Sequence, residues 1–340
     1  MNTTFIDACY GKKTSYTPVW YMRQAGRYLP EYRKLKEKHT ILEIVKTPEL
    51  AAKVSLQPID ILGVDAAILF ADIMVPLIGI GVDLEIVESI GPVIKYPIAS
   101  LKDVQKLRDL EPELDIPYLL KTIKILKKEL HNRVPLIGFS AAPFTLASYM
   151  IEGKPTRDFI KTKSLMYNNR EAWDLLMQKL SEIIIVYLKA QVATGVQALQ
   201  LFDSWVGCLS EADYQIYVLP HVKIIFDALK SDTVPLIHFG TNTAGMLSAF
   251  SSVSCDVVSV DWRISITKAW NQIGQDKAIQ GNLDPVLLFS DFSIIKKRVD
   301  DIFSSLPKSE GYIFNLGHGV LPGTPVANLQ KLTEYVHSKI

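Results

Sequence analysis

The chain has 340 residues, of which 48% are hydrophobic and 21% are charged, a composition typical of a globular protein. Its formal net charge of +1 does not indicate binding to nucleic acid or to a membrane surface. The three cysteines lie far apart without a C-x-x-C pair, which argues against a disulfide framework or a cysteine-rich zinc site and fits a reducing compartment.

The N-terminal residues do not resemble a targeting segment. They contain Asp7 and no long apolar run, so neither a secretory signal nor an arginine-rich transit peptide is expected. The longest uncharged run, residues 134–151, is interrupted by Pro135, Gly138 and Pro143, so a membrane-spanning helix is not expected there. These features predict a cytoplasmic protein.

Eight short apolar runs recur along the chain, and helical patterns lie between them. Several runs are nearly continuous in Val, Ile, Leu and Phe, which is typical of strands in a buried parallel sheet. The runs are residues 18–22, 64–70, 134–140, 197–202, 234–239, 256–262, 277–282 and 311–317. This alternation predicts the α/β class and a single (β/α)8 barrel of the TIM type over residues 1–340. Two domains divided near residues 140–190 are the weaker alternative.

The connections between the predicted strands are uneven in length. About sixty residues separate the second run from the third, and again the third from the fourth. We therefore expect a barrel with an embellished N-terminal segment and long loops after strands two and three. Within the first of these loops, residues 82–98 predict a hairpin around Gly91 and Pro92.

Two arginines follow the first predicted strand. Arg23 and Arg27 lie four residues apart around Gly26. Guanidinium pairs match the geometry of carboxylate and phosphate groups, and a glycine lets the backbone approach a ligand closely. The alternatives are that Arg23 and Arg27 are plain surface arginines or that they are ion-pair partners of Glu31. We expect an anion-binding loop.

Other unusual polar residues also fall at the carboxyl ends of predicted strands, where barrel enzymes carry their catalytic groups. Asp72 lies in an apolar run after strand two, and a buried carboxylate must find donors or lose its charge. It is either a functional acid or a structural acid bonded to backbone amides. His318, between two glycines, is either a ligand contact or a loop residue bonded to the barrel, and Tyr149 equally fits a core position. For Asp203, Asp261 and His238 we favour a polar plug at the barrel mouth.

Common nucleotide and protease motifs do not occur. The sequence has no G-x-x-x-x-G-K-[ST], no G-x-G-x-x-G after a strand, no H-E-x-x-H and no G-x-S-x-G. From pattern alone the sequence predicts a barrel enzyme that binds an anionic ligand through arginines and contains one buried aspartate. Asp65, at the opposite end of strand two, is expected to have a structural role.

The stretch PVWYMRQAGRYLPEYR strongly resembles the N-terminal signature of the uroporphyrinogen decarboxylase family. Over nearly the whole chain, LFADIM, GFSAAPFTLASYMIEG, LQLFDSW, SVDW, IQGNLDP and FNLGHGVLPGTP resemble segments of that family in the same order. The resemblance implies a decarboxylase without cofactor or metal on a (β/α)8 barrel, usually a homodimer. Its implied reaction converts uroporphyrinogen to coproporphyrinogen, with four acetate carboxyls released as CO2.

The resemblance also implies roles for single residues. Asp72 would accept hydrogen bonds from pyrrole N–H groups and stabilise the transition state. The implied substrate-binding residues are Arg23, Gln24, Ala25, Gly26, Arg27, Asp72, Tyr149, Phe202, Ser204 and His318. Lys36 stands where the family often has a third arginine, and we leave it out of the site because lysine lacks the planar fork. The donor of the ring proton stays open among His318, Tyr149, an arginine and a trapped water.

Two other functions compete with this interpretation. A zinc-dependent corrinoid methyltransferase of similar outline would carry an H-x-C metal site near strand five, but this chain has His238-Phe239-Gly240 there. A non-catalytic tetrapyrrole carrier would keep the arginines but would not need Asp72.

Overall fold

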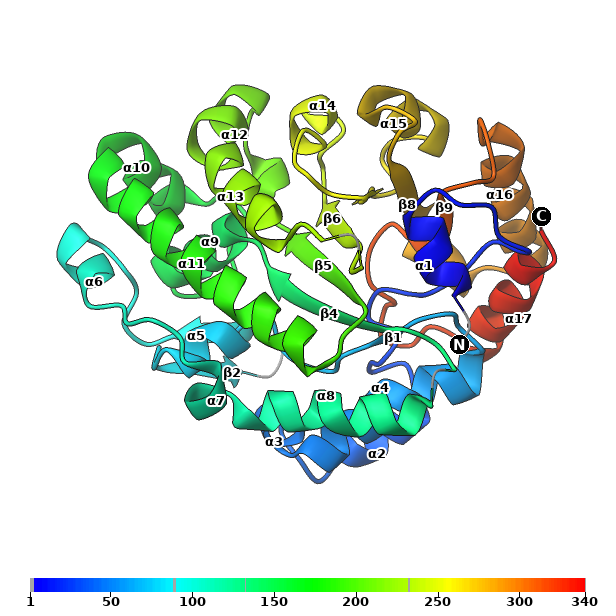
Figure 1. Ribbon diagram of the computed structural model, residues 1–340, viewed down its shortest axis with the longest axis horizontal. Coiled ribbons are helices and arrows are strands. Elements are labelled where there is room, and N and C mark those ends of the chain that lie inside the picture. Colours follow the sequence, from blue (N-terminus) through cyan, green and yellow to red (C-terminus); the bar gives the residue numbers. More distant parts are fainter. Residues whose placement is uncertain (1–2, 88–89, 132, 232, 340) are drawn as a thin grey trace.

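The computed structural model describes residues 3–87, 90–131, 133–231 and 233–339. Within these residues, seven parallel strands form a curled sheet in the order β1-β4-β5-β6-β7-β8-β9, with helices on its outside (Figure 1). The strands are β1 (Ala67–Ile68), β4 (Leu136–Ala141), β5 (Ala198–Asp203), β6 (Leu236–Gly240), β7 (Val257–Ser259), β8 (Ala278–Leu283) and β9 (Tyr312–Leu316). The predicted α/β barrel class is confirmed.

The first predicted strand, residues 18–22, pairs only through an isolated parallel bridge from Val19 to Phe314 of β9. On its other side, the Asp65 N–H donates to the Val19 carbonyl at 2.7 Å, so the segment lies between β9 and the start of β1. A regular ladder does not form because side chains accept the backbone N–H groups of the segment. Val19 donates to Asp65, Tyr21 to Gln24 and Met22 to Asn315.

Among the described residues, seven helices pack on the outer face of the sheet, and most of them connect one strand to the next (Figure 1). They are α4 (Pro48–Leu62), α8 (Pro117–Leu130), α11 (Arg170–Thr194), α13 (Leu219–Leu229), α15 (Ile266–Ile273), α16 (Phe292–Ser305) and α17 (Val326–His337). The N-terminal elements are α1 (Thr4–Cys9), α2 (Pro30–Lys36) and α3 (Ile41–Lys46). Loop helices are α5 (Val75–Gly79), α6 (Leu101–Gln105), α7 (Pro112–Asp115), α9 (Pro143–Glu152), α10 (Ile160–Asn168), α12 (Glu211–Tyr217), α14 (Leu247–Phe250), η1 (Val206–Cys208) and η2 (Pro285–Phe289).

The predicted hairpin is present as the antiparallel pair β2 (Leu84–Val87) and β3 (Gly91–Ile94). Gly91 and Pro92 begin β3 instead of forming the turn, and Glu88 and Ser89 lie outside the described residues. The Ile94 N–H donates to the Gly153 carbonyl at 2.7 Å, which ties the hairpin to the end of α9.

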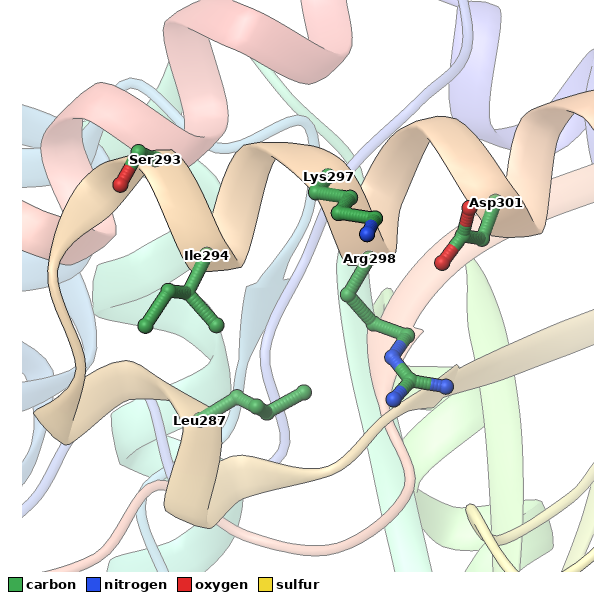
Figure 2. Close-up of a pocket in the computed structure, with 6 residues that line it drawn as sticks. All are labelled: Leu287, Ser293, Ile294, Lys297, Arg298 and Asp301. Carbon is green, nitrogen blue, oxygen red and sulfur yellow. The ribbon is translucent and has the colours of Figure 1, made fainter.

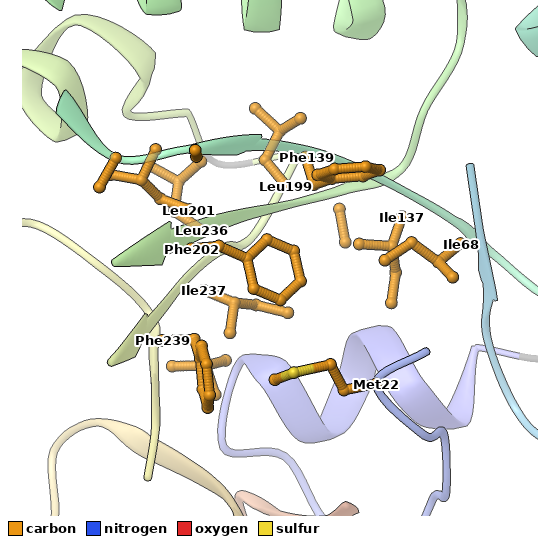
Figure 3. Close-up of a cluster of buried hydrophobic side chains, with 14 of the residues drawn as sticks. Met22, Ile68, Ile137, Phe139, Leu199, Leu201, Phe202, Leu236, Ile237 and Phe239 are labelled. Carbon is orange, nitrogen blue, oxygen red and sulfur yellow. The ribbon is translucent and has the colours of Figure 1, made fainter. Parts of the chain in front are cut away.

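The barrel interior combines an apolar cluster with buried amides. Side chains of β1, β4, β5 and β6 pack together with Met22 inside the sheet (Figure 3). In the same interior, the Trp20 indole donates to Gln280 at 2.7 Å, and Gln280 donates to Gln200 and Ser259. These bonds connect the 18–22 segment with β5, β7 and β8, and so help to fix the segment that carries the arginine loop.

Candidate active site

The predicted site residues follow successive strands and meet at the carboxyl end of the barrel. Arg23 and Arg27 follow the 18–22 segment, Asp72 follows β1, and Tyr149 lies on α9 after β4. Phe202 is the last residue but one of β5, Ser204 directly follows β5, and His318 follows β9. Because the carboxyl ends of parallel strands meet at one face of a barrel, a ligand there can reach all of these residues.

The arginine loop is braced by local hydrogen bonds to its backbone carbonyls. Gln24 N–H donates to the Tyr21 carbonyl at 2.9 Å, and the Tyr28 hydroxyl donates to the Gln24 carbonyl at 2.7 Å. Arg23 has a positive φ of 58°, which is uncommon for a residue other than glycine. A Cβ on Gly26 would lie 2.8 Å from the Arg23 carbonyl oxygen, so glycine is needed for this tight turn.

Gln24 differs from the arginines beside it. Its side chain is fully buried, accepts from the Tyr21 N–H and donates to the Ala66 carbonyl at 2.9 Å. The carboxamide therefore fastens the loop to the residue before β1, so the backbone of Gln24 is the part that remains for contact with a ligand. Ala25 and Gly26 are half-buried.

Arg23 packs against the loop that carries His318. A Cβ on Gly319 would overlap Cγ and Cδ of Arg23, so this second glycine makes room for the guanidinium stem. Although Arg23 keeps contact with solvent, the surrounding protein lowers its pKa by desolvation. Tyr149 and Asp72 raise the pKa of Arg23, whereas Arg27 lowers it, so these four side chains share one electrostatic site.

Asp72 is a half-buried carboxylate whose Oδ1 accepts from the Met74 N–H at 2.9 Å. Desolvation raises its pKa, while the Met74 N–H and the Arg23 charge oppose that rise. The backbone bond holds the carboxylate in place and uses one of about four acceptor positions. Asp72 is thus both anchored by an amide and able to accept further donors.

Tyr149 is 9% exposed, and its ring centroid lies 3.9 Å from that of Trp205. Burial raises the pKa of Tyr149, the Asp72 charge raises it further, and Arg23 opposes the rise. Its hydroxyl is therefore a neutral hydrogen-bond donor at physiological pH. Sequence reasoning missed Trp205, although it directly follows Ser204.

His318 is a neutral imidazole with a defined tautomer. The Gly319 N–H donates to Nδ1 at 2.7 Å, which leaves the ring proton on Nε2. Burial, together with the Arg23 and Arg263 charges, lowers the pKa of His318 to about 4, while the Asp261 charge opposes the shift. His318 can therefore donate a hydrogen bond from Nε2 to an anion without carrying charge.

Aromatic rings of β4, β5 and β6 lie in a row (Figure 3), and His318 continues this row beyond Phe239. Ring centroids are 5.5 Å apart between Phe139 and Phe202, 5.8 Å between Phe202 and Phe239, and 6.3 Å between Phe239 and His318. The predicted pocket residue Phe202 lies in the middle of this row. The row offers an apolar surface beside the charged groups.

Ser204 is half-buried, and its carbonyl accepts from Thr241 Oγ1 at 2.5 Å.

The proposed polar plug is only partly right. His238 turns outward, stacks on Phe250 at 3.7 Å and contacts Phe226 of α13, because Phe239 takes the inward position of β6. Burial lowers the pKa of His238 to about 3. Asp261 accepts from the Asn242 N–H at 2.7 Å and therefore ties together the loops after β6 and β7.

A surface hollow lies away from these residues, between η2 and α16 (Figure 2). Its lining is Leu287, Ser293, Ile294, Lys297, Arg298 and Asp301.

Among the described residues, no group of three or more His, Cys, Asp or Glu side chains could hold a metal ion. No helix in the described part of the chain is long and apolar enough to cross a membrane.

Comparison with known proteins gives one consistent family. The family model "Uroporphyrinogen decarboxylase (URO-D)" matches residues 1–339. Uroporphyrinogen decarboxylase of Carboxydothermus hydrogenoformans is 52% identical over 337 residues, which cover 99% of this chain and 96% of the relative. That of Bacillus subtilis is 52% identical over 336 residues, which cover 99% and 95%. A methyltransferase structure from Methanosarcina mazei matches with a TM-score of 0.80 at 21% identity, covering 98% and 97%, which shows a common fold alone.

Proposed function

The chain belongs to the uroporphyrinogen decarboxylase family, and on that basis we propose that it decarboxylates uroporphyrinogen in porphyrin and haem biosynthesis. Each of the four acetate arms of uroporphyrinogen III loses CO2 and gains one proton to become a methyl group. The product is coproporphyrinogen III, and the enzyme is a carboxy-lyase. The observation that supports this most is the Asp72 carboxylate, held at the barrel mouth beside Arg23 and Tyr149.

The chemistry requires an electron sink for the bond that breaks when CO2 leaves. Many decarboxylases obtain that sink from a cofactor. A porphyrinogen pyrrole is electron-rich and can be protonated on a ring carbon, which gives an iminium-like cation that accepts the electron pair. We therefore propose that the reaction needs no cofactor or metal.

Asp72 is proposed to stabilise this cation. Its carboxylate would accept hydrogen bonds from the pyrrole N–H groups, and its attraction for the ring grows as positive charge develops. An interaction that strengthens toward the transition state lowers the barrier. Because an ionised Asp72 serves as the counter-charge, it cannot also donate the proton in the same step.

The remaining residues are proposed to hold the carboxylate arms. Uroporphyrinogen carries eight carboxyls and a charge of roughly −8 near neutral pH. We assign Arg23 and Arg27 mainly to arms that are not reacting, because a carboxylate gripped by arginine is stabilised and resists leaving. His318 would donate from Nε2 to an arm, and its low pKa argues against a role as the proton donor. Tyr149, Ser204 and Phe202 would complete the pocket.

We further propose that residues 1–340 form one domain and that the protein is a cytoplasmic homodimer. The single domain is supported by a sheet whose strands extend from β1 to β9, with the 18–22 segment beside both of these strands. The dimer is inferred from the family, and light scattering of the purified protein tests it. The cysteines Cys9, Cys208 and Cys255 are all free, which fits a reducing compartment.

Anaerobic incubation with uroporphyrinogen III tests the activity directly. Chromatography of the oxidised products should show hepta-, hexa- and pentacarboxylate intermediates followed by the tetracarboxylate product. Binding without any loss of carboxyl groups would instead identify a tetrapyrrole carrier. A stoichiometric zinc content together with methyl transfer would favour the methyltransferase alternative, which the outward-facing His238 disfavours.

A further inference from the structure

Arg263 is a third arginine at the barrel mouth, on the loop after β7. Its guanidinium lies over the Trp262 ring, with the carbon of the guanidinium 4.2 Å from the ring centroid. Its Nη1 donates to Asp261 Oδ2 at 2.7 Å, and its backbone N–H donates to Oδ1 of the same carboxylate at 3.0 Å. Stacking on one face and the ion pair on one edge hold this side chain in one orientation, so little conformational entropy is lost when it binds a ligand.

The two partners of this ion pair differ in exposure, and the positive partner is the one that faces solvent. The Asp261 side chain is 2% exposed, whereas the Arg263 side chain is 44% exposed. Asp261 also accepts from the Asn242 N–H, so its charge is shared among three donors, which are that N–H, the backbone N–H of Arg263 and the guanidinium itself. Arg263 has five N–H donors, and the bond to Asp261 uses one of them. An anion that arrives from solvent would therefore meet the guanidinium first.

Arg263 and Arg23 lie on opposite sides of the His318 loop. On one side, a Cβ on Gly319 would overlap the Arg23 stem, and on the other, a Cβ on Gly317 would lie 2.5 Å from the Trp262 backbone nitrogen. The two glycines thus let the His318 loop pack between Arg23 and the Trp262–Arg263 pair. Both arginine charges lower the pKa of His318, which shows that both act on the same part of the mouth.

We propose that Arg263 binds a carboxylate arm of the substrate, on the far side of His318 from Arg23. The three side chains then form one anion-binding row: Arg23, the Nε2–H of His318, and Arg263. A tetrapyrrole whose arms project around a ring can place separate carboxylates on the two arginines, with the neutral His318 between them. This role presupposes the proposed function, so the test must distinguish failure of binding from failure of catalysis.

Anaerobic titration of the protein with uroporphyrinogen, followed by tryptophan fluorescence, measures binding whether or not the chain decarboxylates. Arg263→Gln keeps a donor for Asp261 while it removes the charge, and we expect it to weaken binding roughly tenfold, equal to the loss of one good ion pair. Arg263→Lys should recover part of that loss because it restores the charge without the fork. In the decarboxylation assay, KM of Arg263→Gln should rise by a similar factor while kcat stays within about twofold of wild type.

Two comparisons make the result specific. Arg298→Gln, an exposed arginine in the hollow of Figure 2, removes the same charge far from the mouth and should leave binding unchanged. Coproporphyrinogen carries propionate arms but no acetate arms. If Arg263 holds a propionate, Arg263→Gln should also bind coproporphyrinogen more weakly than wild type. If Arg263 holds an acetate, the two proteins should bind coproporphyrinogen equally. Unchanged uroporphyrinogen binding by a folded Arg263→Gln, or an equal loss in Arg298→Gln, would overturn the proposal.

Discussion

At the residue scale, the protonation states of buried groups define what each can do. His318 is neutral with its proton on Nε2, Tyr149 is a neutral phenol, and Asp72 is an anchored acid close to Arg23. The site therefore separates groups that donate hydrogen bonds to anions from the Asp72 carboxylate, which can face a cation. This division agrees with a reaction that brings carboxylate arms and creates positive charge on a ring.

Replacement of Arg27 by Lys tests whether the arginines only hold the substrate. Arg27 is exposed at the mouth, and lysine keeps the charge but loses the planar fork. We expect KM to rise several-fold, whereas kcat remains near the wild-type value, in steady-state assays of decarboxylation. A large fall in kcat with unchanged KM would instead assign Arg27 to proton delivery.

Asp203 predicts a pH dependence of stability. Its carboxyl is buried at the end of β5, Oδ1 accepts from Thr145 Oγ1 at 3.2 Å, and Oδ2 has no hydrogen-bond partner among the described residues. Burial raises the pKa of Asp203 from 3.8 to about 7, so the native state binds more protons than the unfolded state between these values. The contribution of Asp203 to stability is therefore present at low pH and is lost as the pH rises through about 7.

Asp203→Asn should remove this dependence because an amide does not ionise. Thermal melts from pH 4 to pH 8 should show the wild type losing stability relative to Asp203→Asn, by up to about 1.4 kcal/mol per pH unit within that window. Parallel pH profiles of the two proteins would contradict a buried, protonated Asp203.

At the scale of elements, the sequence predicts the strands better than the directions of side chains. Seven of the predicted runs overlap an observed strand, because continuous apolar residues are typical of a buried parallel sheet. The first run, residues 18–22, does not form a regular strand because some of its backbone N–H groups donate to side chains that are distant in sequence. A local sequence pattern does not reveal such bonds. Gln24 is included in the predicted site because its segment resembles the family signature; its side chain is buried and bonds to the Ala66 carbonyl, so its backbone is the part that can contact a ligand. Arg263 is not among the predicted site residues, although it lies two residues after Asp261, which is singled out as a polar residue near the end of a predicted strand.

The close contact between Gly319 and the Arg23 side chain can be tested by substitution. Gly319→Ala should push the Arg23 stem out of its position, because the added methyl would overlap Cγ and Cδ. We expect KM for uroporphyrinogen to rise roughly tenfold, about the contribution of one ion pair, with a small change in melting temperature. Gly245→Ala is a matched control, since a Cβ there meets no heavy atom within 4 Å. Equal kinetics of the two variants would show that the contact with Arg23 does not matter.

At the scale of the whole molecule, Asp65 joins the two ends of the chain at the amino end of the barrel. It accepts from the Tyr16 hydroxyl at 2.8 Å and from the Val19 N–H at 2.8 Å, and it contacts His337 Nε2 at 2.7 Å. These contacts give Asp65 the structural role expected from its place before strand two. They also hold the 18–22 segment, and hence the arginine loop, in the barrel.

Asp65→Ala should therefore reduce the free energy of unfolding by about 3 kcal/mol, since it leaves buried donors without an acceptor. Urea denaturation measures this change. Asp60→Ala, which breaks an exposed ion pair with Arg133, should leave stability close to that of wild type. Similar midpoints for the two variants would show that Asp65 does not hold the barrel closed.

The central claim is that Asp72 stabilises positive charge on the substrate ring. The most direct measurement is the single-turnover rate of uroporphyrinogen decarboxylation by Asp72→Asn, with substrate binding measured in parallel. The amide keeps the size of the side chain and can still accept from the Met74 N–H, but it lacks the charge. We predict that the rate falls on the order of 10²-fold or more while substrate still binds. A rate within a few-fold of wild type would contradict the proposed role of Asp72.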